Sequence, residues 1–204
     1  KERKMKNDRV REMTLAGVFG AMILFLSLVP SPWGQWGFIR FNSGIEFTIV
    51  HIPVIIGAIF GGRRVAITLG LIFGIGSISA AAIYGGPTAV FFLNPLVSVL
   101  PRILFGFFTY LIYSGLSKAI KNPGISISLT AILSTLVHTV LVLSMLYVFF
   151  LMPDALIDVI GDETLKSLIL VLLSWNMLIE VSLAAAIVTP IALRVKEFKE
   201  ANNY

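Results

Sequence analysis

Five ionisable side chains lie within the long apolar stretches of this sequence. An ionisable group costs free energy in the hydrocarbon core of a membrane, so it usually faces the interior of a helix bundle and marks a binding site or an ion path. The five residues are Glu46, His51, Arg102, His138 and Glu180. Arg102 could bind an anion or hold a helix end, and Glu180 could be its counter-charge or a hydrogen-bonded acid. His138 could be a ligand-binding residue, a proton relay or a hydrogen-bonded core histidine.

Aromatic and amide side chains add a second kind of candidate chemistry. The segment VPSPWGQWGFIRFNSG, residues 29–44, carries several aromatic residues between prolines and glycines. It could form an interfacial aromatic belt or a lid over a flat apolar ligand, since aromatic rings give a large contact area. The aromatic and amide candidates for substrate binding are Trp33, Trp36, Phe41, Tyr84, Asn94, Trp175 and Asn176.

Motifs for catalysis are missing from the sequence. It contains no HExxH, GxSxG or Walker motif, and no cysteine that could form a disulfide or a thiolate metal site. GLIFGIGS, residues 70–77, lies in an apolar stretch with no preceding strand, which indicates helix packing rather than a phosphate-binding loop. We therefore expect no enzyme activity, no catalytic residues, no bound metal and no cofactor.

The amino-acid composition indicates whether these residues lie in a soluble protein or in a membrane protein. The chain has 204 residues, of which 57% are hydrophobic and only 13% are charged, and its mean hydropathy is +0.92. Soluble domains have about 25% charged residues, so the sequence predicts an integral membrane protein. We expect one all-α membrane domain over residues 1–204.

Proline, glycine and charged residues divide the chain into six predicted membrane spans. Each needs roughly 20 apolar residues to cross about 30 Å of hydrocarbon. The predicted spans are 10–29, 45–60, 65–83, 95–116, 125–150 and 165–193. With about 1.5 Å of rise per residue, Arg102, Asn176, His138 and Glu180 lie progressively deeper and could line one cavity between the last three spans.

The positive charges predict the orientation. With six spans, thirteen of the sixteen Lys and Arg residues fall on the side that holds both termini. By the positive-inside rule this side is the cytoplasm. The other side receives Asp154, Asp158, Asp162 and Glu163. Because the net charge of +5 is then mostly topological, we expect no nucleic-acid partner.

The first predicted span carries two pairs of small residues four positions apart. Ala16 pairs with Gly20, and Gly17 pairs with Ala21. Small residues at this spacing leave a groove that lets another helix approach closely within a lipid bilayer. The groove could receive a partner protein or a neighbouring helix of the same chain.

A series of segments resembles a known transporter family over residues 10–193. The segments are IVHIPVIIGAIFGG (49–62), LIFGIGSISAA (71–81), FFLNPLVSVLPRILFG (91–106), HTVLVLSMLYVFF (138–150) and WNMLIE (175–180). They resemble the substrate-binding S components of energy-coupling factor (ECF) vitamin transporters, of the pantothenate and riboflavin types. The resemblance implies a cell-membrane protein that captures a vitamin from outside and has no ATPase of its own. It also implies docking on a membrane-embedded T subunit, energised by two ABC-type ATPases, through Ala16, Gly17, Gly20 and Ala21.

Three functions stay open from the sequence. The loop aromatics and the sparse intramembrane charge favour riboflavin as the vitamin. Pantothenate is the alternative, because its carboxylate could bind Arg102 or Arg40. An alternative of another class is a secondary transporter that acts alone, with His138 and Glu180 relaying protons, although the two halves of the chain show no repeat of the kind that such carriers often have.

Overall fold

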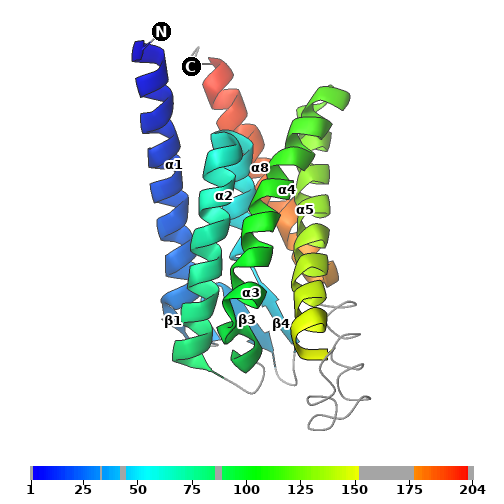
Figure 1. The fold of residues 1–204 in the computed structure, drawn as a ribbon. Coiled ribbons are helices and arrows are strands. Elements are labelled where there is room, and N and C mark those ends of the chain that lie inside the picture. Colours follow the sequence, from blue (N-terminus) through cyan, green and yellow to red (C-terminus); the bar gives the residue numbers. More distant parts are fainter. Residues whose placement is uncertain (1, 33, 42–44, 86–88, 152–176, 202–204) are drawn as a thin grey trace.

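A computed structural model describes residues 2–32, 34–41, 45–85, 89–151 and 177–201 of the chain. These residues form a bundle of long helices with a small sheet at one end (Figure 1). The helices are α1 (Glu2–Leu28), α2 (His51–Tyr84), α3 (Pro95–Ser98), α4 (Leu100–Ala119), α5 (Pro123–Leu146) and α8 (Met177–Ala201), with a 3₁₀ turn η1 (Ala89–Leu93) and a π-helical turn η2 (Tyr147–Leu151).

Most of the predicted helical spans are present. Within the described residues, five helices are long and apolar enough to cross a membrane: α1, α2, α3 with α4, α5 with the start of η2, and α8. The first half of the predicted span 165–193 lies outside the described residues, and α8 covers the second half. The number of six crossings and the cytoplasmic location of the termini stay predictions.

Helix α2 holds the second and third predicted spans in two segments. A straight helix of 34 residues would be about 51 Å long, which exceeds the thickness of the hydrocarbon core. The chain bends at Gly62, whose φ of 74° lies in the left-handed region that glycine adopts readily. A Cβ on Gly57 would lie 2.1 Å from Cδ1 of Leu69, so the two segments pack against each other.

Residues 30–48 correct the predicted loop and the start of the second span. They form a four-stranded antiparallel sheet of β1 (Pro30–Ser31), β2 (Gly34–Gln35), β3 (Phe38–Phe41) and β4 (Ile45–Thr48), in that order. Arg40 pairs with Glu46 across β3 and β4. The second span was predicted to begin at residue 45, but its helix begins at His51, because β4 pairs with β3 before the chain turns into the helix.

Asparagine–proline pairs start two of the helices. The Asn94 side chain accepts a hydrogen bond from the Leu96 N–H at the start of α3. The Asn122 side chain accepts hydrogen bonds from the N–H groups of Gly124 and Ile125 at the start of α5. Asparagine satisfies free N–H groups at a helix start, and the proline that follows it has no N–H to leave unpaired.

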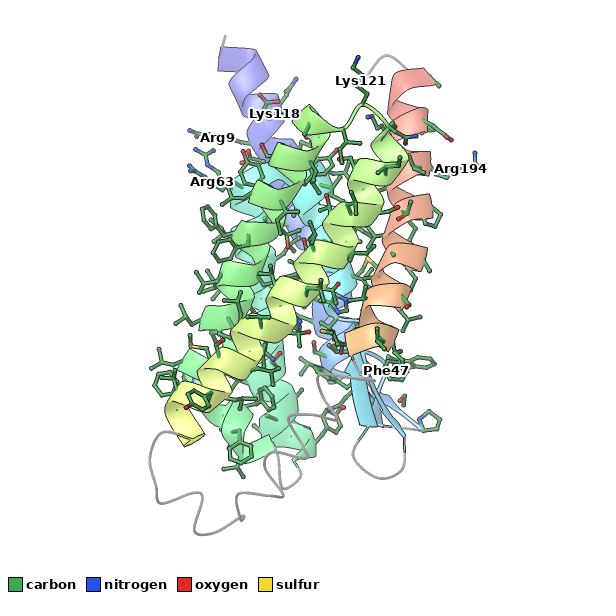
Figure 2. All side chains as sticks on the ribbon, turned by 90° about the vertical axis from the view of Figure 1, so that its right-hand side faces the viewer. Arg9, Phe47, Arg63, Lys118, Lys121 and Arg194 are labelled. Carbon is green, nitrogen blue, oxygen red and sulfur yellow. The ribbon has the colours of Figure 1, made fainter. Side chains whose placement is uncertain are left out.

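The basic residues gather at one end of the bundle. Figure 2 shows Arg9, Arg63, Lys118, Lys121 and Arg194 at the end opposite the sheet, and both ends of the described chain lie at this same end (Figure 1). We call it the basic end and the other the sheet end. This arrangement matches the distribution of charge that the sequence predicts, with Arg and Lys residues on the side of the termini.

Glycines bring α2 and α4 into backbone contact. A Cβ on Gly70 would lie 2.3 Å from the carbonyl oxygen of Arg102, and one on Gly106 would lie 2.2 Å from that of Ala66. Side-chain atoms do not fit in such gaps, so only glycine allows this approach. The packing role predicted for GLIFGIGS is confirmed, and the contact fixes the position of the α4 turn that carries Arg102.

Candidate functional site

Arg102 is buried near the start of α4, with only 5% of its surface exposed. Its Nη1 donates a hydrogen bond to the carbonyl oxygen of Val97 at 2.8 Å. The guanidinium carbon lies 5.5 Å from the ring centroid of Phe73 on α2 and 5.4 Å from that of Phe92 on η1, within the range of cation–π attraction. Its Nε has no hydrogen-bond partner among the described residues. The side chain is therefore held in place and keeps a donor for a ligand.

His51 and His138 form a stacked pair beside this arginine. His51 is the first residue of α2, and His138 lies on α5. Their ring centroids are 5.9 Å apart with 21° between the ring planes. The ring of Phe105 lies 4.9 Å from His138 and 6.5 Å from His51, centroid to centroid. All four imidazole nitrogens are buried, and those of His138 lack a hydrogen-bond partner among the described residues, whereas His51 interacts with the backbone of Thr48.

Phe73 connects the arginine to the histidine pair. Its ring centroid is 5.5 Å from the guanidinium carbon of Arg102 and 5.5 Å from the ring centroid of His138. Arg102 and His51 both lie within electrostatic range of His138. The sequence placed Arg102 and His138 in one site, and the structure brings them together with the aid of α2, which the prediction did not include.

Glu180 lies at the edge of the same site and joins α8 to the sheet. Its side chain is 8% exposed, and its Oε1 accepts a hydrogen bond of 2.7 Å from the N–H of Thr48, the last residue of β4. The carboxylate also interacts electrostatically with Arg102. This buried carboxylate links α8 to the end of β4 beside the polar cluster.

Several ring and guanidinium nitrogens of this cluster are buried without a partner among the described residues. A buried donor or acceptor without a partner costs about 1–3 kcal/mol, and buried polar groups normally have a partner. Here Nε of Arg102 and both ring nitrogens of His138 are such atoms among the described residues. Hydrogen bonds to a polar ligand or to water would remove this cost. The cluster therefore has the properties of a site for a small polar molecule.

The other predicted binding residues lie elsewhere or outside the described part. Trp36 lies between β2 and β3 with 43% of its surface exposed. The Tyr84 hydroxyl donates a hydrogen bond to the Leu28 carbonyl oxygen at 2.5 Å, and Asn94 caps α3. Phe41 is a residue of β3 whose side chain is not described. Trp33, Trp175 and Asn176 lie outside the described residues. Their role in ligand binding stays a prediction.

The small residues of α1 face two directions. A Cβ on Gly20 would lie 2.8 Å from Cδ1 of Ile72 on α2, and Ala16 packs against the core cluster. Gly17 and Ala21 are exposed, and a Cβ on Gly17 would meet no atom within 4 Å. One pair therefore packs within the chain, and the other pair lies open on the bundle surface.

Sequence reasoning left four contributors out of the predicted site. His51 was recognised as an ionisable residue in an apolar stretch but was not placed with His138. Phe73, Phe92 and Phe105 are apolar residues within spans or beside them, and nothing in their spacing separates them from lipid-facing phenylalanines. The signal for His51 was its type, because the chain has only two histidines and both lie in apolar stretches.

Five helices long and apolar enough to cross a membrane, packed around a buried polar cluster, define a multi-pass membrane protein. Residues 11–192 match the family model described as "ECF transporter, substrate-specific component". The chain therefore belongs to this family of S components, which is a family of transporter subunits and not of enzymes. The family predicted from the sequence is confirmed.

The chain is also similar in sequence to a known transporter. The chain is 29% identical over 164 residues to the pantothenic acid transporter PanT of Lactococcus lactis subsp. cremoris (strain MG1363). The alignment covers 72% of this chain and 77% of the relative.

Proposed function

We propose that this chain is the substrate-capture subunit of an ECF-type importer for pantothenate. The observation that carries the proposal is the buried Arg102, held between Phe73 and Phe92 with a free Nε donor. A planar guanidinium can bind a carboxylate through two parallel hydrogen bonds. Pantothenate has a carboxylate, whereas riboflavin is neutral and gives no reason for a buried cation. The similarity to PanT supports the same choice.

The basic residues at one end of the bundle support an orientation for this proposal. With the basic end in the cytoplasm, the sheet end faces the outside, and the polar cluster lies below the sheet. Pantothenate then reaches Arg102 from the sheet end. The captured vitamin is released inward after the subunit docks on a membrane-embedded T subunit that two ABC-type ATPases energise.

Binding to the isolated subunit tests this proposal. We expect titration calorimetry on the purified protein to show tight binding of pantothenate, and no binding of riboflavin at the same concentrations. Absorbance of the preparation provides a second readout, because a flavin-binding protein purifies with a yellow ligand. A yellow preparation that does not bind pantothenate would favour the riboflavin prediction. Pantothenate uptake into liposomes that contain only this chain and a pH gradient would instead support a secondary transporter.

The open pair on α1 gives a test of docking. We expect Gly17→Leu to reduce the amount of T subunit that co-purifies with this chain by about tenfold, equivalent to 1.4 kcal/mol of association free energy. A leucine at this position fills the groove that a partner helix needs, but it meets no atom of its own chain within 4 Å at Cβ. Pantothenate binding should not change.

A neighbouring substitution is the control for docking. Val18 is 55% exposed on the same helix, so Val18→Leu adds bulk beside the groove without filling it. Gly20→Leu is a poor test, because the side chain would collide with Ile72 and disturb the packing of α1 on α2. Normal assembly of the Gly17→Leu protein would argue that the exposed pair faces lipid only.

A further inference from the structure

The stacked histidines extend the polar cluster away from Arg102. Both rings are almost completely buried, His51 at 0% and His138 at 4% exposure, and they come from helices that are far apart in the sequence. Neither ring is needed to hold the guanidinium, which is fixed by Val97, Phe73 and Phe92. The proposed role of Arg102 as the carboxylate site therefore leaves the histidine pair without a function.

The chemistry of two imidazoles restricts what can bind them. A neutral imidazole has one N–H donor and one acceptor nitrogen, so the pair offers two donors and two acceptors. One nitrogen of His51 interacts with the backbone of Thr48, which leaves its other nitrogen and both nitrogens of His138 for a ligand. A hydroxyl group both donates and accepts, and it matches such a pair better than a carboxylate, which only accepts. The pair is thus suited to a ligand segment with adjacent hydroxyl groups.

The surroundings of the pair add an apolar requirement. Phe105 packs against both imidazole rings, and Phe73 packs against His138 on the side that leads to Arg102. A ligand segment at the pair must therefore present hydroxyl groups to the nitrogens and methyl or methylene groups to the phenylalanines. The pantoyl part of pantothenate has this composition, with two hydroxyl groups on either side of a dimethyl carbon.

We infer that His51 and His138 bind the hydroxyl end of the substrate and so determine specificity for the pantoyl group, while Arg102 holds the carboxylate at the other end. This inference rests on the proposed function of the chain as a pantothenate-binding subunit. In this orientation the substrate passes along Phe73, which contacts both anchoring groups.

The test compares two ligands that differ only in the hydroxyl groups. Titration calorimetry measures the affinity for pantothenate and for its dideoxy analogue, in which hydrogen replaces both hydroxyls and the carboxylate is retained. The wild-type protein should prefer pantothenate by at least about 100-fold, because a site built to bond a hydroxyl rejects an analogue without one. His138→Phe and His51→Phe keep an aromatic ring and should each reduce this preference to about tenfold or less.

Two further variants keep the result interpretable. His138→Gln retains a donor and an acceptor and should recover part of the preference, and it serves where the phenylalanine variant does not fold. Ser126→Ala removes another buried polar group of α5, about 18 Å from His138 along the helix axis, and should leave the preference as in wild type.

The outcomes separate this inference from the proposed function. Wild-type protein that does not bind pantothenate overturns both. Wild-type protein that binds pantothenate and the dideoxy analogue equally well overturns the inference alone. A preference that is unchanged in His138→Phe and in His51→Phe also overturns it, because the hydroxyl groups would then bind elsewhere.

Discussion

Arg102→Met is expected to lower the affinity for pantothenate by at least about 100-fold, which corresponds to roughly 3 kcal/mol. The substitution removes the cation that binds the carboxylate, and a carboxylate buried without a partner is strongly unfavourable. Methionine has an unbranched side chain that can occupy the space between Phe73 and Phe92. Because Arg102 interacts with the buried Glu180 carboxylate, removing its charge alone should also lower stability, so binding is measured on the folded fraction.

A neutral ligand is the control for this prediction. Pantothenol carries a hydroxyl group in place of the carboxylate and keeps the pantoyl end. Because specificity is a difference between two affinities, Arg102→Met should lose its preference for pantothenate over pantothenol while it still binds pantothenol about as well as wild type. Titration calorimetry measures both ligands, and thermal unfolding in detergent reports the fold. A variant that binds pantothenate with wild-type affinity would place the carboxylate elsewhere.

The helices could be predicted because their signals are local. Asn94–Pro95 and Asn122–Pro123 start helices through short-range capping, and apolar runs of sufficient length mark the spans. Capping and apolar runs each depend on residues that are close in the sequence. The common end of the termini followed instead from counting Lys and Arg between the predicted spans along the whole chain.

The sheet was missed although its sequence contains a hairpin signal. FIRF (38–41) and IEFT (45–48) each mix apolar and polar residues, and three residues that include a glycine separate them. Strands of this length are too short to stand out, and IEFT runs directly into an apolar helix. Hydropathy therefore extended the second span back to residue 45.

The candidate site could likewise be predicted only in part from the sequence. Arg102, His138 and Glu180 were found because a charged or ionisable side chain in an apolar span has few explanations. The partners that give the site its shape, Phe73 and Phe105, could not be identified, since a phenylalanine on a membrane helix can face lipid or protein equally well. Only the packing of α2 on α4 shows that these rings face inward.

The close packing of α2 on α4 leads to the second prediction with a large expected effect. Gly106→Ala is expected to destabilise the protein by about 1–3 kcal/mol, although it adds a single methyl group. Its Cβ would lie 2.2 Å from the carbonyl oxygen of Ala66, a distance at which the backbones of α2 and α4 must move apart. Thermal unfolding in detergent should show the loss as a lower Tm.

The same helix provides a matched control in which the change in stability should have the opposite sign. Gly115 also lies on α4, and a Cβ there would meet no atom within 4 Å. Alanine is favoured over glycine in a helix by up to about 1 kcal/mol, so Gly115→Ala should leave the Tm unchanged or raise it. The chemical change is identical at both positions, and only the space available to the methyl group differs.

A third alanine substitution, at Gly70, connects the contact between α2 and α4 to the binding of pantothenate. The Cβ of Gly70→Ala would lie 2.3 Å from the carbonyl oxygen of Arg102, so the variant displaces the backbone that carries the guanidinium and removes no group that touches a ligand. We expect weaker pantothenate binding in the fraction that folds, measured by titration calorimetry, with wild-type affinity in Gly115→Ala. A wild-type Tm and a wild-type affinity for pantothenate in both Gly70→Ala and Gly106→Ala would contradict this prediction. In that case α2 and α4 do not approach each other as closely as described, and the position of Arg102 does not depend on their contact.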